Sequence, residues 1–184
     1  MAIIYVTGGA RSGKSSFAEE LANKREKRVY VATAIPFDDE MKFRVKLHQE
    51  QRGKNWLNIE AYRDLDIKLE ESVSDEEVIL VDCLTNMVTN IMIMERDIDW
   101  SKLPEDEFVE LERGIIAEVD KLLCYADRFN GDMIIVSNEV GMGLVPEYHL
   151  GRRFRDIAGR VNQYVAKRAD EAYLIVSGLS MKLK

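Results

Sequence analysis

The sequence predicts an α/β fold with a mostly parallel sheet covered by helices on both faces. Apolar runs of strand length, rich in β-branched residues, alternate along the chain with segments of helical periodicity. No repeat or low-complexity tract interrupts this alternation, which is typical of a parallel sheet between two layers of helices. The 184 residues, of which 46% are hydrophobic, suit a single domain over residues 1–184 with one sizeable core.

The first half of the chain is expected to form strand–helix repeats. A β-branched run at residues 29–33 is typical of a buried strand, and Pro36 places a loop after it. Asp38 or Asp39 can cap the helix that follows. In order, we expect a strand at 3–6, a helix at 16–28, a strand at 29–33, a loop at 34–38, a helix to about residue 53, an extended segment at 56–62 and a short helix at 64–71.

The second half continues the alternation. A Met- and Ile-rich segment at 87–94 is expected to pack in the core, because Met fills irregular gaps. A long helix follows, with one apolar stripe made of Phe108, Leu111, Ile115, Val119, Leu122 and Ala126. The expected elements are a strand at 77–82, a helix starting near residue 84, a connection at 97–104, the long helix, a strand at 132–137, a loop at 138–146, a helix at 147–170 and a final strand at 172–177.

The helix expected at 147–170 has an apolar side and several arginines. Its apolar side carries Leu150, Phe154, Ile157, Val161 and Val165. The arginines are Arg152, Arg153, Arg155 and Arg160, and most of them are expected to be solvated or paired with acids. His149 lies in a segment without a matching motif and is expected to be structural.

A glycine-rich turn directly follows the first strand. Its sequence, Gly8-Gly9-Ala10-Arg11-Ser12-Gly13-Lys14-Ser15, fits the phosphate-binding pattern G-x-x-x-x-G-K-[ST] between a strand and a helix. In such a P-loop, backbone N–H groups converge on phosphate oxygens at a helix N-terminus. Lys14 is expected to reach the β- and γ-phosphates, Ser15 to bind Mg²⁺, and Ser16 to complete the nucleotide-binding residues. The alternative is a plain glycine turn. The pattern predicts a P-loop NTPase-type fold that binds a nucleoside triphosphate.

Asp82 ends the apolar strand at 77–82. A carboxylate in this position beside a P-loop is typical of a Walker B residue, which lies near Mg²⁺ directly or through water. The alternative is that Asp82 caps the helix that starts near Leu84. Both roles are compatible.

Composition excludes several classes of protein. The net charge of −7 argues against a surface for indiscriminate binding of nucleic acid or anionic membranes. The two cysteines, Cys83 and Cys124, are widely separated, so they indicate reduced thiols rather than a disulfide framework or a zinc site. No apolar run approaches the roughly 20 residues that a membrane span needs, and no leader peptide is indicated. We therefore expect a cytoplasmic protein.

A second group of candidate functional residues follows Pro36. Arg44, His48 and Arg52 recur at intervals of four and share one face of the expected helix, with Trp56 one interval further. The flanking cations favour the neutral imidazole that a nucleophilic histidine requires, and the arginines could hold the phosphates under attack. The alternative is an ordinary exposed helix surface.

The loop at 138–146 is a candidate wall of the substrate-binding site. The alternative is that it only connects a strand to the next helix. It contains Asn138, Glu139, Gly141 and Gly143, followed by Pro146. Two glycines and a proline in so short a segment predict special backbone conformations at the same edge of the sheet as the P-loop.

Taken together, these motifs resemble the bifunctional adenosylcobinamide kinase / adenosylcobinamide-phosphate guanylyltransferase family of cobalamin biosynthesis. The resemblance covers nearly the full length. It is carried by Thr7 to Ser15, by Asp38-Asp39-Glu40-Met41 with Arg44, His48, Arg52, Trp56 and Glu60, by Asp82-Cys83-Leu84-Thr85 with Met87-Val88-Thr89-Asn90, by Ser137 to Gly143 with Val145-Pro146, by Phe154 to Gln163, and by Val176-Ser177-Gly178-Leu179.

The resemblance implies two reactions. The first moves the γ-phosphoryl of ATP or GTP to the hydroxyl of adenosylcobinamide. The second transfers GMP from GTP to adenosylcobinamide phosphate through a covalent histidine intermediate, at the position of His48, and releases pyrophosphate. Some family members carry Glu at the position of Asp82. A homotrimer is also implied. The implied nucleotide contacts beyond the P-loop are Ala34, Ile35, Pro36, Arg44, Gln49, Glu50, Gln51, Arg52 and Glu60.

Two other functions stay open from the residues alone. A small-molecule kinase of another substrate would use the P-loop and Asp82 and have no need of His48. A non-catalytic nucleotide switch would change its partner binding with the bound nucleotide.

Overall fold

A computed structural model describes residues 1–35, 55–94, 98–143 and 145–184. These residues form one seven-stranded sheet in the order β3-β2-β4-β5-β1-β6-β7. The strands are β1 (Ile3–Gly8), β2 (Arg28–Ala32), β3 (Trp56–Glu60), β4 (Val78–Asp82), β5 (Asp132–Asn138), β6 (Glu171–Val176) and β7 (Leu179–Lys182). The helices are α1 (Lys14–Ala22), α3 (Leu65–Ser72), α4 (Leu84–Ile93), α5 (Glu105–Ala126) and α6 (His149–Arg168).

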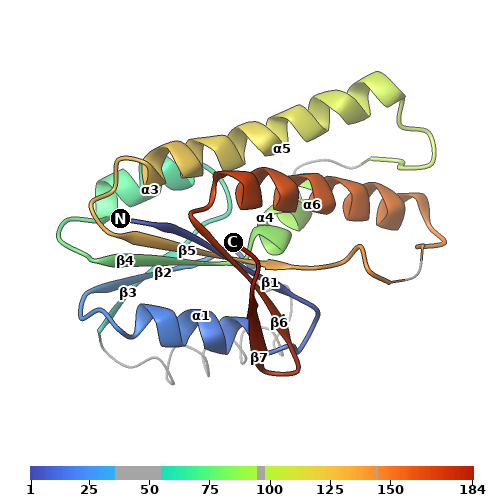
Figure 1. Cartoon of the computed structure of the whole chain (residues 1–184). Coiled ribbons are helices and arrows are strands. Elements are labelled where there is room, and N and C mark those ends of the chain that lie inside the picture. Colours follow the sequence, from blue (N-terminus) through green and yellow to red (C-terminus); the bar gives the residue numbers. More distant parts are fainter. Residues whose placement is uncertain (36–54, 95–97, 144) are drawn as a thin grey trace.

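Helices cover both faces of the sheet. Helix α1 lies on one face, and α3, α4, α5 and α6 lie on the other (Figure 1). Every strand pair is parallel except β6 with β7. Two apolar clusters fill the two interfaces. The smaller joins α1 to one face of the sheet, and the larger joins the remaining helices to the other. The predicted fold class is confirmed.

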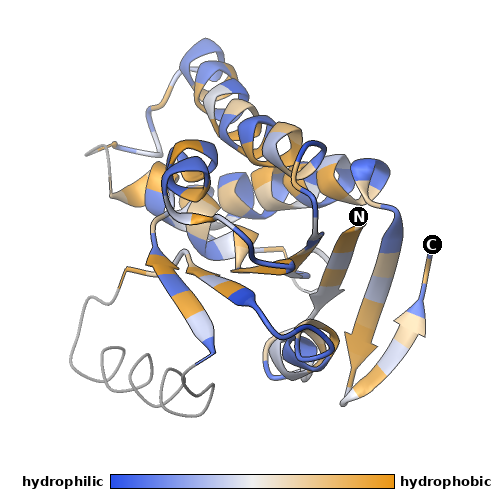
Figure 2. Cartoon of the chain, turned by 90° about the vertical axis from the view of Figure 1, so that its left-hand side faces the viewer, coloured by the Kyte–Doolittle hydropathy of each residue, from blue (hydrophilic) through white to orange (hydrophobic). Residues whose placement is uncertain are grey.

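The helices bury the stripes that the sequence predicts, and Figure 2 shows apolar residues along them. All six residues of the predicted α5 stripe are buried. In α6, Ile157, Val161 and Val165 are buried, while Leu150 and Phe154 are half-buried against the same core. Met87 and Met92 are buried as predicted, whereas Met94 is 44% exposed. Burial of these stripes is what holds the helices on the sheet.

The arginines of α6 are largely paired, as predicted. Arg153 donates to Glu105 at 2.6 Å, and Arg155 lies 3.2 Å from Asp156. Arg160 pairs with Glu112, and Arg152 donates to the carbonyls of Pro146 and Glu147. These contacts lie on the exposed side of the helix, where each pair contributes little to stability.

One predicted helix end is wrong, and one strand was not predicted. Helix α1 ends at Ala22 rather than at 28, because residues 23–27 are exposed and carry no apolar side chain to pack. The strand predicted as the last is followed by β7, which returns antiparallel. All four residues of β7 are exposed, so it lacks the apolar run that marks a buried strand. The helix predicted from Asp38 or Asp39 to about residue 53 lies outside the described residues.

The hairpin between β6 and β7 turns through Ser177 and Gly178. Both have positive φ, at 51° and 81°, as a two-residue type I′ turn requires. Figure 2 shows β7 at the edge of the sheet, with apolar and polar residues alternating along it.

Within the described ranges, no helix combines the length and the apolar character that crossing a membrane requires.

Candidate nucleotide-binding site

The predicted site residues that the structure describes gather at one edge of the sheet. Parallel register places Gly8 opposite Asn138, and Ala32 opposite both Glu60 and Asp82. The carboxyl ends of β1 to β5 therefore meet at the same edge, which is where open α/β sheets bind ligands.

The P-loop connects β1 to α1 with positive φ at two positions. Gly13 has a φ of 94° and Arg11 a φ of 59°. The Ser12 N–H donates to the Gly9 carbonyl at 3.2 Å, which closes the loop on itself. Gly13 is the N-cap of α1 and makes no side-chain cap, so the first N–H groups of the helix are not capped by a side chain. Such a loop is a ready-made anion site.

Lys14 points back over this loop. Its Nζ donates to the Gly9 carbonyl at 3.2 Å, and the residue is 8% exposed. The ammonium is therefore held beside the loop rather than extended into solvent. Ser15 is half-buried in the first turn of α1, and Ser16, Ala10 and Arg11 are exposed.

Asp82 ends β4 at the same edge and does not cap α4. The N-cap residue of α4 is Cys83, with no side-chain cap bond, so the capping alternative is wrong. The Asp82 carboxylate instead accepts from the Tyr30 hydroxyl at 3.1 Å. In the described part of the chain, no three His, Cys, Asp or Glu side chains gather into a metal-binding group. Ser15 and Asp82 still offer hard oxygens, and Mg²⁺ accepts few protein ligands.

Thr33, just after β2, holds the backbone that carries Asp82. Its hydroxyl donates to the Cys83 carbonyl at 2.6 Å and accepts from the Cys83 N–H at 2.8 Å. Its own N–H donates to the Asp82 carbonyl at 3.2 Å. The buried amide of Asn90 donates to the Thr33 carbonyl at 2.7 Å. The sequence did not predict this set of hydrogen bonds around Thr33, which we call the Thr33 clamp. Thr33 is 1% exposed, so these bonds form away from water.

A Thr33→Val variant is expected to lose about 2–3 kcal/mol of unfolding free energy, because it leaves two buried groups, the Cys83 N–H and carbonyl, without their partner. The measurement is urea unfolding of the purified variant. Thr33→Ser keeps the hydroxyl and is the matched control, with a smaller loss of about 1 kcal/mol for one methyl group. Equal losses in the two variants would show that the hydroxyl contributes nothing.

Cys83 is a buried thiol beside this clamp. Burial, with the Asp82 charge as a second cause, raises the pKa of the Cys83 thiol to about 11. Both cysteines are free, in agreement with the prediction of reduced thiols. The thiolate is the reactive form of cysteine, so burial and the raised pKa of Cys83 disfavour its reactive state.

A cavity of about 390 Å³ lies next to the ends of β2 and β3. Ala34, Ile35 and Glu60, three of the predicted nucleotide contacts, line it. Their proximity follows from the pairing of the two strands, continued by the Ala61 N–H that donates to Ala32 at 3.1 Å. Tyr62 and Arg63 also line the cavity. Sequence reasoning did not assign them, although both follow Glu60 closely in the chain.

The loop after β5 begins beside the P-loop. The Glu139 N–H donates to the Gly8 carbonyl at 3.0 Å, and the Glu139 carboxylate accepts from the Gly141 N–H at 2.5 Å. Among the described glycines, positive φ occurs at Gly13 and Gly178 and not in this loop, so the predicted special conformations do not include a left-handed glycine there. A Cβ at Gly141 would lie 3.0 Å from Glu139 Oε1, a contact that the end of this flexible side chain can relieve. Gly143 is exposed.

Asn138 is tied to both helices that flank this edge. Its N–H donates to the Thr85 hydroxyl of α4 at 2.7 Å, and its carbonyl accepts from Asn162 of α6 at 3.1 Å. The Ser137 hydroxyl completes the network by donating to Asn162 Oδ1 at 2.6 Å. These buried side chains fix where β5 ends.

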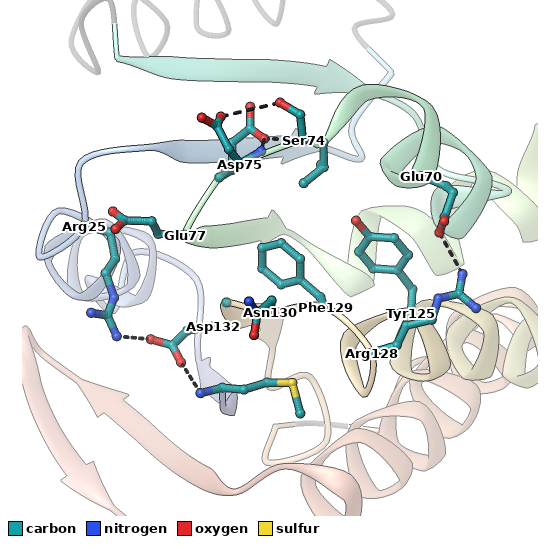
Figure 3. Close-up of a pocket in the computed structure, with 14 residues that line it drawn as sticks. Arg25, Glu70, Ser74, Asp75, Glu77, Tyr125, Arg128, Phe129, Asn130 and Asp132 are labelled. Atoms are coloured by element: carbon teal, nitrogen blue, oxygen red, sulfur yellow. Dashed lines mark hydrogen bonds and ion pairs between the residues drawn. The ribbon is translucent and has the colours of Figure 1, made fainter.

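The pocket in Figure 3 belongs to the opposite edge of the sheet. It measures about 580 Å³ and lies around Glu77 and Asp132, where β4 and β5 begin. Its arginines are already paired, Arg25 with Asp132 at 2.7 Å and Arg128 with Glu70 at 3.0 Å. This pocket therefore takes no part in the site around the P-loop.

Comparison with known proteins decides the family. The family model described as cobinamide kinase / cobinamide phosphate guanyltransferase matches residues 4–183. The chain belongs to this family. Proteins named bifunctional adenosylcobalamin biosynthesis protein CobU, from Escherichia coli (strain K12) and Salmonella typhimurium (strain LT2), are each 42% identical over 183 residues, which is 99% of this chain and 99% of each relative. The resemblance inferred from the motifs is confirmed.

A solved structure supports the fold alone. It is described as a prototypical ATPase from the type III secretion system of pathogenic bacteria. Its TM-score is 0.51 at 14% identity, and the match covers 98% of this chain and 56% of that chain.

Some of the predicted site residues lie outside the described residues. These are Pro36, Arg44, His48, Gln49, Glu50, Gln51 and Arg52. His149, the other histidine, is the exposed first residue of α6. The proposed role of His48 rests on the family pattern.

Proposed function

We propose that the chain catalyses two successive transfers in cobalamin biosynthesis. It phosphorylates adenosylcobinamide with ATP or GTP, and it then transfers GMP from GTP to adenosylcobinamide phosphate with release of pyrophosphate. The observation that carries the proposal is a P-loop, with Lys14 folded over it, in a chain 42% identical along its whole length to bifunctional relatives.

The P-loop would serve both reactions. In the first, the hydroxyl oxygen of adenosylcobinamide attacks the γ-phosphorus, the bond from the γ-phosphorus to the bridging oxygen breaks, and the hydroxyl proton leaves. Lys14 and the loop N–H groups would hold the phosphates, so that catalysis is mainly positioning and electrostatics. Ser15 and Asp82 would hold Mg²⁺, whose charge offsets the negative charge of the phosphates when it is bound.

His48 would act in the second reaction only. Its neutral imidazole nitrogen attacks the α-phosphorus of GTP, and pyrophosphate leaves. A phosphate oxygen of adenosylcobinamide phosphate then attacks the same phosphorus and frees the imidazole. A covalent intermediate divides one difficult displacement into two easier ones. Arg44 and Arg52, on the same predicted helix face, would hold the phosphates, with Gln49, Glu50 and Gln51 as further nucleotide contacts.

The cavity at the ends of β2 and β3 would hold the guanosine. Ala34 and Ile35 line it together with Glu60. A carboxylate accepts hydrogen bonds only, and the Watson–Crick edge of guanine presents two neighbouring N–H donors, which adenine lacks. Glu60 therefore supports GTP as the GMP donor.

The loop after β5 would face the corrinoid. Glu139 is bonded to the Gly8 carbonyl through its N–H, so this residue lies next to the start of the P-loop. We assign it as the general base that takes the hydroxyl proton in the first reaction. Asn138, Gly141 and Gly143 would form the wall beside it.

The assembly is proposed to be a homotrimer. Support comes from the hairpin of β6 and β7, which exposes Val176, Leu179, Met181 and Leu183 by 55%, 76%, 59% and 58%. Val176 pairs with Leu179, so apolar side chains of both strands share one face. Exposed apolar patches of this kind mark protein contacts. We also propose a cytoplasmic enzyme without nucleic-acid partners, in keeping with its net charge of −7.

Product analysis tests the function. The purified protein is incubated with adenosylcobinamide and either ATP or GTP. The corrinoid products are then separated and identified by mass spectrometry. ATP is expected to yield adenosylcobinamide phosphate alone, and GTP to yield adenosylcobinamide-GDP with pyrophosphate. An unmodified corrinoid with both nucleotides would contradict the proposal, and phosphorylation without GMP transfer would restrict it to the kinase reaction.

A further inference from the structure

The turn between β6 and β7 lies directly against the P-loop. The Gly178 N–H donates to the Ser12 carbonyl at 2.8 Å. A Cβ at Gly13 would lie 3.2 Å from the Gly178 Cα. The motif Val176-Ser177-Gly178-Leu179, which no step of the proposed chemistry uses, therefore contacts the loop that is expected to hold the triphosphate.

Strand β6 extends this contact to the start of the loop. A Cβ at Gly8 would lie 2.5 Å from the Ile175 carbonyl, so only glycine fits there. The Ser12 hydroxyl is buried at the same junction, with no hydrogen-bond partner among the residues described. The P-loop is thus packed against the hairpin at both of its ends, without room for a side chain at Gly8.

The bond to Ser12 also orients the next N–H group. In a trans peptide, the carbonyl and the following N–H point in opposite directions. Because the Ser12 carbonyl is held toward Gly178, the Gly13 N–H is turned away from the hairpin, and we expect it to face the inside of the loop. A loop whose N–H groups already point inward has less ordering to undergo when an anion binds.

We propose that the β6–β7 turn positions the P-loop for triphosphate binding, with Gly178 as the positioning residue. This inference rests on the proposed function, since it takes a nucleoside triphosphate as the ligand of the loop. Gly178 acts through Ser12 and Gly13 and does not itself contact the ligand.

The conformation of Gly178 provides a matched pair of variants. Its φ is 81°, and nothing lies within 4 Å of a Cβ added there. A side chain therefore has room, and only the backbone conformation decides the outcome. Asn tolerates positive φ, whereas the β-branched Val strongly disfavours it.

The test compares Gly178→Val with Gly178→Asn in calorimetric binding of a non-hydrolysable GTP analogue with Mg²⁺. We expect Gly178→Val to bind roughly tenfold more weakly, the ratio that corresponds to the usual cost of a left-handed non-glycine residue. Gly178→Asn is expected to stay within about threefold of the unchanged protein. Equal affinities of the two variants would overturn the inference.

The Lys14→Ala variant distinguishes a failure of this inference from a failure of the proposed function. If the unchanged protein binds the analogue and Lys14→Ala does not, the P-loop is the site, and normal binding by Gly178→Val overturns only the role of the turn. If the unchanged protein fails to bind, the proposed function itself is wrong.

Hydrogen exchange on the unchanged protein covers the case in which Gly178→Val does not fold. The analogue is expected to slow exchange of the Gly178 amide more than exchange of the amides in α5, which lies on the face of the sheet opposite α1 and contributes no residue to the proposed nucleotide site. No difference between the two regions would contradict a link between the turn and the P-loop.

Discussion

A His48→Ala variant is expected to lose GMP transfer by about 1,000-fold or more, because the nucleophile of that reaction is removed. It is expected to keep most of its kinase activity, since phosphoryl transfer to a hydroxyl needs no covalent intermediate. With GTP labelled at the α-phosphate, the unchanged protein should carry acid-labile, base-stable label, and the variant should carry none.

The control uses the second histidine of the chain. His149 is the exposed first residue of α6, so His149→Ala should retain both the label and GMP transfer. Label that persists in His48→Ala would falsify the assignment of the nucleophile. Equal loss of both reactions in His48→Ala would mean that His48 serves the fold or both steps.

A Lys14→Ala variant is expected to lose adenosylcobinamide phosphorylation by about 100-fold or more, because a cation that stabilises charge on the transferred phosphoryl is removed. GMP transfer should fall as well, since the same ammonium would hold the pyrophosphate that leaves. Initial rates at saturating nucleotide, with either corrinoid substrate, provide the measurement.

Lys24→Ala is the control for Lys14→Ala. Lys24 is an exposed lysine just beyond the other end of α1, so its loss changes the net charge equally and leaves the P-loop intact. Both reactions should proceed at the normal rate in Lys24→Ala. A Lys14→Ala variant that retains full kinase activity would show that the ammonium is not part of the phosphate site.

Local patterns predicted the parts of the fold and of the site that depend on neighbours in the sequence. The P-loop, the apolar stripes of α5 and α6, and Asp82 at the end of β4 all follow from residue types at short spacing. Their meeting at one sheet edge follows from parallel pairing. By contrast, β7 is four exposed residues long, and its best signal was the turn residue Gly178.

The buried side-chain hydrogen bonds could not be predicted, because the residues that they join are remote in the sequence. Asn90 bonds to Thr33 across 57 residues, and Ser137 bonds to Asn162 across 25. Nothing about a single Thr or Asn indicates which distant backbone it will reach. The loop at 138–146 shows a related limit, since glycine permits positive φ without requiring it.

The hairpin of β6 and β7 has both a contact with the P-loop and an exposed apolar face. Its turn is bonded to the P-loop, and its outer face is apolar and exposed. Thermodynamic linkage then requires reciprocity. If a neighbouring subunit steadies the hairpin, it raises the affinity for nucleotide by the same factor by which nucleotide strengthens the contact between subunits. Dilution of the protein would weaken nucleotide binding, and nucleotide would oppose dissociation of the assembly.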